Sequence, residues 1–220
     1  MFDGVKLIKK EQLISWRSSG LVFVVVPGLI FLVIYLNWLV MFYLYEFFSF
    51  EFRIFIFLCL MGFSVYGFLL CGVFSKSKYG ILGSLRARSQ SVSYEIVFRL
   101  FVIRVVFFGG GFRFFPLGGG LLLVLIFCFF FVFLGELNRA PFDFSEGESE
   151  LVSGYNVEFG SVSYALLYIG EYGNVLFFRL LFSLLFFDYS FVVFYLIFVF
   201  MIFVRRSYPR FRYDMIIGFF

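Results

Sequence analysis

The acidic side chains of this sequence are the groups that could carry chemistry, and they stand beside or inside long apolar runs. The stretch GELNRAPFDFSEGESE (135–150) holds five carboxylates and directly follows LLLVLIFCFFFVFL, whose only polar side chain is the thiol of Cys128. Two further acids, Glu95 and Glu171, interrupt other apolar runs. An ionised carboxylate in hydrocarbon is costly, so such a group pairs, faces water or takes up a proton. A series of carboxylates leading from a loop into a membrane is what a proton or cation path requires.

Each acid also has a simpler interpretation. Glu95 and Arg99 are four residues apart, a spacing that allows a static salt bridge on one helix. Glu171 has no basic residue three or four positions away, which favours a functional or water-exposed role. The acidic loop could be an ordinary solvated connection. Against that, SEGE (145–148) matches a capping box, so an ordered helical turn is expected there.

The composition narrows the chemistry further. The chain has 220 residues, is 63% hydrophobic and contains 41 Phe, whereas a soluble domain is about half apolar. It has no His, which excludes histidine-ligated metals and the usual general base. Its three Cys lie apart in apolar runs without CxxC spacing, so they indicate neither a disulfide framework nor a metal site. GGGFRFFPLGGG (109–120) lies between apolar runs and is interpreted as a hinge loop, not a phosphate cradle.

The elements that must position these acids are membrane helices. A bilayer core needs roughly 20 apolar residues in a helix. That length predicts six spans and an all-α polytopic membrane protein, with the spans at about 21–45, 54–74, 88–108, 117–135, 162–183 and 190–204. The predicted organisation has three parts: an interfacial amphipathic segment (1–20), a six-helix membrane domain (21–204) that includes the acidic loop (136–161), and a basic tail (205–220).

The basic residues indicate how these spans are oriented. With six spans, thirteen of the 18 Lys and Arg fall on the side of both termini and the acidic loop, two fall on the other side, and three lie within spans. Such a bias is typical of the side on which the protein is made. The acidic loop is therefore expected to face the cytoplasm or the equivalent compartment of an organelle.

Four segments then carry a resemblance to a known family. They are ELNRAPFDFSEGESELVSGYNVEFGSVSYALLYIGEYGN (136–174), SKYGILGSLRARSQSVSYE (77–95), SYPRFRYD (207–214) and FDGVKLIKKE (2–11). Along the chain, and in the same order as in the family, they resemble the motifs of the NADH dehydrogenase subunit 1 family, the quinone-chamber membrane subunit of respiratory complex I. The resemblance runs through nearly the whole chain.

The resemblance implies a membrane core subunit of the proton-pumping NADH:ubiquinone oxidoreductase of the mitochondrial inner membrane, with the acidic loop and both termini in the matrix. Ubiquinone would be reduced in a cavity shared with subunits of the hydrophilic arm and with adjacent membrane subunits and lipids, and this chain would hold no metal or flavin and bind no nucleic acid. By position, the proton path would consist of Glu95, Glu136, Asp143, Glu146, Glu148, Glu150 and Glu171. Weaker candidates for the quinone cavity are Asp3, Lys6, Arg139 and Tyr168.

The sequence also departs from the family pattern. Leu137 replaces the usual Thr, Gly170 and Gly173 replace bulkier neighbours of Glu171, and Arg88 and Arg99 are additions. The family has about eight spans, of which the first and last have no counterpart here, so we hypothesise that a separate polypeptide supplies the first helix. Proteomics of the intact complex that found no such peptide would contradict the hypothesis.

Two other functions remain open at this point. The chain could be a membrane anchor or ion-translocating subunit of a related hydrogenase or antiporter-type complex, or a purely structural anchor for a peripheral arm. Hydrogen or formate chemistry in the isolated assembly would indicate the former, and intact pumping after neutralisation of Glu171 and Glu146 would indicate the latter.

Overall fold

Helices make up the regular structure of the computed structural model, and no strand occurs among the residues that it describes. These are residues 2–12, 18, 20–40, 53–109, 122–138, 142–143, 154–186 and 190–209. The predicted all-α class is confirmed. Most of the acidic loop and the Gly-rich segment after Gly109 lie outside the described residues.

A helix occupies the position of each expected span. In chain order the helices are α1 (Phe2–Lys9), α2 (Gly20–Val40), α3 (Arg53–Ser75), α4 (Lys78–Gly109), α5 (Leu122–Glu136), α7 (Ser161–Phe186) and α8 (Phe191–Ser207), with a short 3-10 helix η1 (Gly154–Asn156) before α7. Among the described residues, α2, α3 and α7 are long and apolar enough to cross a bilayer, and α5 is a shorter apolar helix. The total of six spans stays a prediction.

The apolar character of α2 suits it to the interior of a bilayer. The 21 residues of α2 contain no charged side chain, and apolar residues surround its whole circumference, which is typical of a membrane span. Pro27 lies inside α2. A proline removes one backbone hydrogen bond, a defect that membrane helices tolerate when neighbouring helices pack around it.

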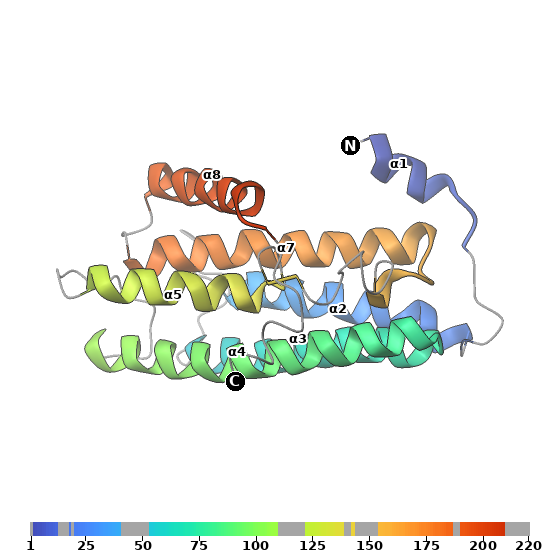
Figure 1. Ribbon diagram of the computed structural model, residues 1–220, viewed down its shortest axis with the longest axis horizontal. Helices are drawn as coiled ribbons and strands as arrows, with labels where there is room; N and C mark the ends of the chain where they lie inside the picture. Colours follow the sequence, from blue (N-terminus) through green and yellow to red (C-terminus); the bar gives the residue numbers. More distant parts are fainter. Residues whose placement is uncertain are drawn as a thin grey trace.

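The long helices run nearly side by side along the long axis of the molecule (Figure 1). α3 contacts both α2 and α4, α2 also contacts α7, and α5 packs between α4 and α7. α8 lies along α7, and α1 lies at one end of the bundle, inclined to it, where it contacts α7. Gln12, just after α1, donates a hydrogen bond of 3.0 Å to the hydroxyl of Ser163.

The connection between α3 and α4 differs from the sequence-based expectation. A link was expected between the spans at 54–74 and 88–108, but α4 begins at Lys78 and only two residues separate it from α3. The hydroxyl of Ser77 accepts a hydrogen bond of 3.1 Å from the backbone N–H of Gly80 and so caps the start of α4. α4 consequently has 32 residues and a length of about 48 Å, which exceeds the roughly 30 Å of a hydrocarbon core.

Close packing of α2 against α3 and α7 depends on glycines. A Cβ atom at Gly67 would lie 2.5 Å from the Cγ1 atom of Ile30. One at Gly170 would lie 3.1 Å from the Cδ1 atom of Ile34, and one at Gly173 would lie 3.0 Å from the Cγ2 atom of Ile34. The two glycines beside Glu171 are therefore explained by packing, because they make room for the β-branched side chains of α2.

Candidate functional site

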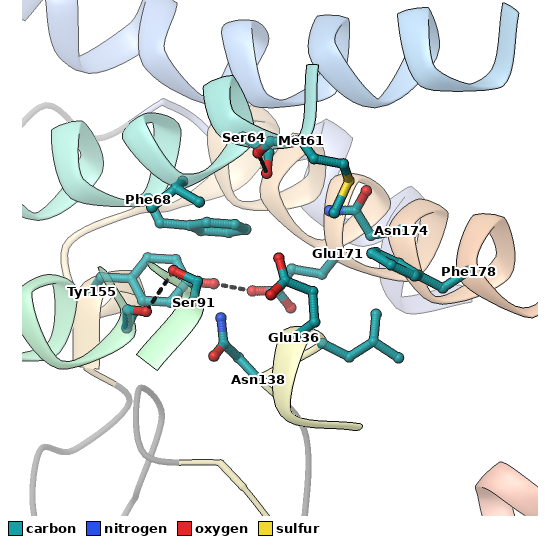
Figure 2. Close-up of a pocket in the computed structure, with 13 residues that line it drawn as sticks. Met61, Ser64, Phe68, Ser91, Glu136, Asn138, Tyr155, Glu171, Asn174 and Phe178 are labelled. Atoms are coloured by element: carbon teal, nitrogen blue, oxygen red, sulfur yellow. Dashed lines mark hydrogen bonds between the residues drawn. The ribbon is translucent and has the colours of Figure 1, made fainter. Parts of the chain in front are cut away.

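A buried cavity between α3, α4, α5 and α7 brings together two of the predicted acids. Glu136, the last residue of α5, and Glu171, three turns into α7, both line it. Figure 2 shows their carboxyl groups reaching into the same space from the two helices. The other polar side chains at the cavity wall are Ser64, Ser91, Asn138, Tyr155 and Asn174, and apolar side chains complete it.

Glu171 is held at the cavity by a phenol. The hydroxyl of Tyr155, which belongs to η1, donates a hydrogen bond to the Oε1 atom of Glu171. The ring of Tyr155 is 3% exposed and meets the edge of the Phe68 ring at 5.5 Å. η1 can sit this close to α4 because both facing residues are glycines: a Cβ at Gly83 would lie 2.8 Å from the Cα atom of Gly154.

Glu95 lies on α4, one helical turn beyond Ser91 of the cavity wall. It is buried and forms an ion pair with Arg99, so the salt bridge that the spacing allows is present. Arg99 also donates a hydrogen bond of 3.3 Å to the carbonyl oxygen of Leu58 on α3. Gly62 makes room for this arrangement, because a Cβ there would lie 2.7 Å from the Nη2 atom of Arg99.

Glu136 is the acid that connects the other two. Its side chain is 8% exposed, and its Oε2 atom is buried without a hydrogen-bond partner among the described residues. Glu95 and Arg99 lie near enough to influence its charge electrostatically. The three membrane acids therefore converge from α4, α5 and α7 on one buried region.

The loop acids are placed only in part. Asp143 is 6% exposed, so this loop acid is buried. Glu146, Glu148, Glu150 and Arg139 lie outside the described residues. In the part of the chain that the structure describes, no group of three or more His, Cys, Asp or Glu side chains could hold a metal ion.

The candidates for the quinone cavity lie elsewhere. Lys6 is exposed on α1, and only the backbone of Asp3 is described there. Tyr168 is half-buried on α7, where its hydroxyl accepts a hydrogen bond of 2.8 Å from Tyr164. Neither Lys6 nor Tyr168 lines the cavity that contains Glu136 and Glu171. Among the residues that the structure describes, the quinone-cavity candidates and the two cavity acids are therefore not brought into one site.

Comparison with known proteins identifies the family of this chain. The model of the NADH dehydrogenase family matches residues 1–220. This chain belongs to that family. The chain is 38% identical to NADH-ubiquinone oxidoreductase chain 1 of Aedes aegypti, in an alignment that covers 98% of this chain and 73% of that protein. The proteins of the same name from Locusta migratoria and Branchiostoma lanceolatum are 36% and 37% identical over the same shares of both chains.

In this member of the NADH dehydrogenase family, sequence reasoning missed the neutral polar residues around the acids. Tyr155 was not singled out, although it binds Glu171. Asn138 and Asn174 line the cavity, and the side-chain oxygen of each is buried without a hydrogen-bond partner among the described residues. A neutral Asn or Tyr gives no charge signal in a sequence. The available indication was that an amide side chain stands two residues after Glu136 and another stands three residues after Glu171.

Proposed function

We propose that this chain is the membrane core subunit of a proton-pumping NADH:ubiquinone oxidoreductase in the mitochondrial inner membrane. In this role it forms part of the quinone chamber and carries protons on carboxylates. Family membership supports the enzyme class, and its animal relatives support the mitochondrial setting. The observation that carries the proton role is the buried cavity onto which both Glu136 and Glu171 open.

The geometry suits the uptake and release of single protons. Glu136 and Glu171 line the same cavity, an arrangement that the passage of a proton from one carboxyl group to the other requires. The hydroxyl of Tyr155 can stabilise Glu171 when it is ionised, by donating its hydrogen bond. Protonation of Glu171 removes the charge that this hydrogen bond stabilises. The bond therefore assists the release of a proton and opposes its uptake.

Glu95 would extend the path on the α4 side. Its pairing with Arg99 stabilises the ionised carboxylate. The Arg99 side chain is 41% exposed, which weakens the attraction, since solvent screens a partly exposed pair. In this proposal Glu136 connects Glu95, which lies near it, to Glu171, with which it shares the cavity.

The loop acids Asp143, Glu146, Glu148 and Glu150 would join this path to the quinone chamber, with Arg139 beside them. Asp3, Lys6 and Tyr168 would belong to the chamber wall. The burial of Asp143 supports the loop part of the proposal. The contact between α1 and α7, which carry Lys6 and Tyr168, supports a wall shared by these two helices.

Neutralising Glu171 tests the proposal. In the assembled complex, Glu171→Gln keeps the shape of the side chain and removes its titratable proton. Positioned acid–base groups contribute on the order of a hundredfold or more to proton-transfer steps, so we expect NADH-driven proton pumping in membrane vesicles to be almost abolished. Glu171→Asp retains a carboxyl group and is expected to keep part of the pumping. Full pumping by Glu171→Gln in a complex assembled at normal levels would overturn the proposed path.

A further inference from the structure

Gln90 of α4 connects two segments that flank the acids. Its side chain is 8% exposed, and its single amide nitrogen donates to two backbone carbonyls. One is the carbonyl oxygen of Gly135 at the end of α5, at 3.1 Å, and the other is that of Phe142 in the acidic loop, at 2.7 Å. Each acceptor immediately precedes an acid, Glu136 in the first case and Asp143 in the second.

The orientation of this amide is well determined by chemistry. A side-chain amide can donate from its nitrogen and accept at its oxygen. The opposite orientation would point the oxygen of Gln90 at two carbonyl oxygens, which repel it. In the observed orientation the Oε1 atom is buried without a hydrogen-bond partner among the described residues. A buried unpaired acceptor costs stability, so the two donated bonds are the reason to keep an amide here.

Tyr94, one turn further along α4, contacts the same two segments. A Cβ atom at Gly135 would lie 2.5 Å from the Tyr94 ring, so the ring packs directly on the backbone of α5. The centroids of the Tyr94 and Phe142 rings are 5.8 Å apart. Gln90 and Tyr94 therefore hold the end of α5 and the start of the acidic loop by polar and apolar contacts respectively.

The last carbonyl groups of a helix lack partners within that helix. Gly135 meets this need through Gln90 and through the backbone N–H of Asn138, at 3.3 Å. Because Glu136 adjoins the carbonyl that Gln90 binds, the hydrogen bond fixes where the Glu136 backbone lies relative to α4. The second bond does the same for Asp143, and α4 also carries Glu95.

We propose that Gln90 is a positioning residue that sets the separation of Glu95, Glu136 and Asp143, and that proton coupling depends on its two donated hydrogen bonds. This inference rests on the proposed function, because it assumes that these acids carry the proton. It assigns no proton transfer to Gln90 itself. Its part is to hold the acceptor and donor acids at a fixed geometry while the quinone chemistry proceeds elsewhere.

The test compares Gln90→Met with Ser89→Ala in the assembled complex. Methionine keeps the length of the side chain and removes both donors. Ser89 is exposed and adjacent to Gln90 on α4. Its hydroxyl donates a hydrogen bond to the backbone carbonyl oxygen of Arg86 on the same helix. The first readout is amide hydrogen exchange of residues 135–143, which does not depend on proton pumping. We expect about a tenfold increase in exchange for Gln90→Met, as the loss of a hydrogen bond implies, and no change for Ser89→Ala.

The second readout is the ratio of protons pumped to electrons transferred, measured beside the rate of quinone reduction in uncoupled vesicles. We expect Gln90→Met to lower the ratio while it retains the reduction rate, a separation that general destabilisation would not give. Unchanged hydrogen exchange would overturn the bridging role. Increased exchange with an unchanged ratio would overturn the coupling role. Failure of the underlying function is detected separately, because Glu171→Gln would then leave the ratio intact as well.

Discussion

The two acids inside long helices have different hydrogen-bond partners, a phenol for Glu171 and a guanidinium for Glu95. A phenol stabilises an ionised carboxylate without adding a charge, whereas a guanidinium adds a compensating positive charge. Replacing the partner therefore removes a hydrogen bond at Glu171 and a compensating charge at Glu95.

Tyr155→Phe isolates the contribution of the phenol. The change keeps the ring against Phe68 and removes only the hydroxyl that Glu171 accepts from. A hydrogen bond to a charged group contributes about 1.5–3 kcal/mol. We expect proton-coupled turnover to fall by about tenfold or more, with normal assembly, in stopped-flow measurements of NADH-driven pumping. A Tyr155→Phe complex with normal turnover would show that the hydrogen bond is dispensable.

Arg99→Ala addresses the ion pair. We expect the variant to preserve proton pumping per electron, because Glu171 and Glu136 remain in place. We also expect a lower melting temperature of the complex, since Arg99 links Glu95 to the carbonyl of Leu58 on another helix.

The double variant Glu95→Gln/Arg99→Ala separates charge from packing. If the loss of stability comes from leaving Glu95 unpaired, neutralising it restores part of the melting temperature. Loss of assembly in both the single and the double variant would instead identify Arg99 as a structural link between α3 and α4.

At the scale of elements, glycine and isoleucine form complementary surfaces between α2, α3 and α7. Membrane helices gain little from excluding lipid, so close backbone approach and van der Waals packing stabilise their contacts. Gly67→Ala is expected to lower the yield of assembled complex, because its Cβ would lie 2.5 Å from Ile30. Blue-native electrophoresis can measure this yield.

The compensating change is Ile30→Ala, which removes the atoms that the new methyl group would meet. We expect the double variant to assemble better than Gly67→Ala alone. A double variant that assembles worse than both single variants would show that Ile30 stabilises the bundle by another route.

At the scale of the whole molecule, the charge distribution predicts that the start of α4 faces the matrix. Arg86 and Arg88 lie on α4, at the same end of it as Lys78 and close in sequence to Lys76. Ser89→Cys places a thiol at an exposed position there. A membrane-impermeant maleimide is expected to label this cysteine in inside-out vesicles and not in intact mitoplasts, as read by mass spectrometry of this chain. The reverse pattern would contradict the proposed orientation.

The sequence predicted much of this architecture because its strongest pattern is simple. Long apolar runs specify membrane helices by length alone, and each of the six expected runs coincides with a helix. The prediction was wrong over residues 78–87, between two expected spans, where polar residues were interpreted as a loop and α4 has already begun. A polar helix that projects from a membrane has the same composition as a link, so hydropathy cannot separate them.

The site was predictable only where charge marked it. Glu136 and Glu171 stood out as acids beside apolar runs, and they meet at the cavity. Tyr155 and Gln90 did not stand out in the sequence, because the role of a neutral residue depends on which residues folding places beside it. Their partners are 16 residues away for Tyr155 and up to 52 for Gln90.

The length of α4 has a mechanical consequence. This one helix contacts η1 at Gly83, contacts the start of the acidic loop through Gln90 and carries the buried acid Glu95. Gly83 and Glu95 are 12 residues apart, which is about 18 Å of stiff rod. Because the helix is continuous between these points, we expect a displacement of η1 at one end to move Glu95 at the other. α4 can thus transmit a displacement from η1 to the buried acids.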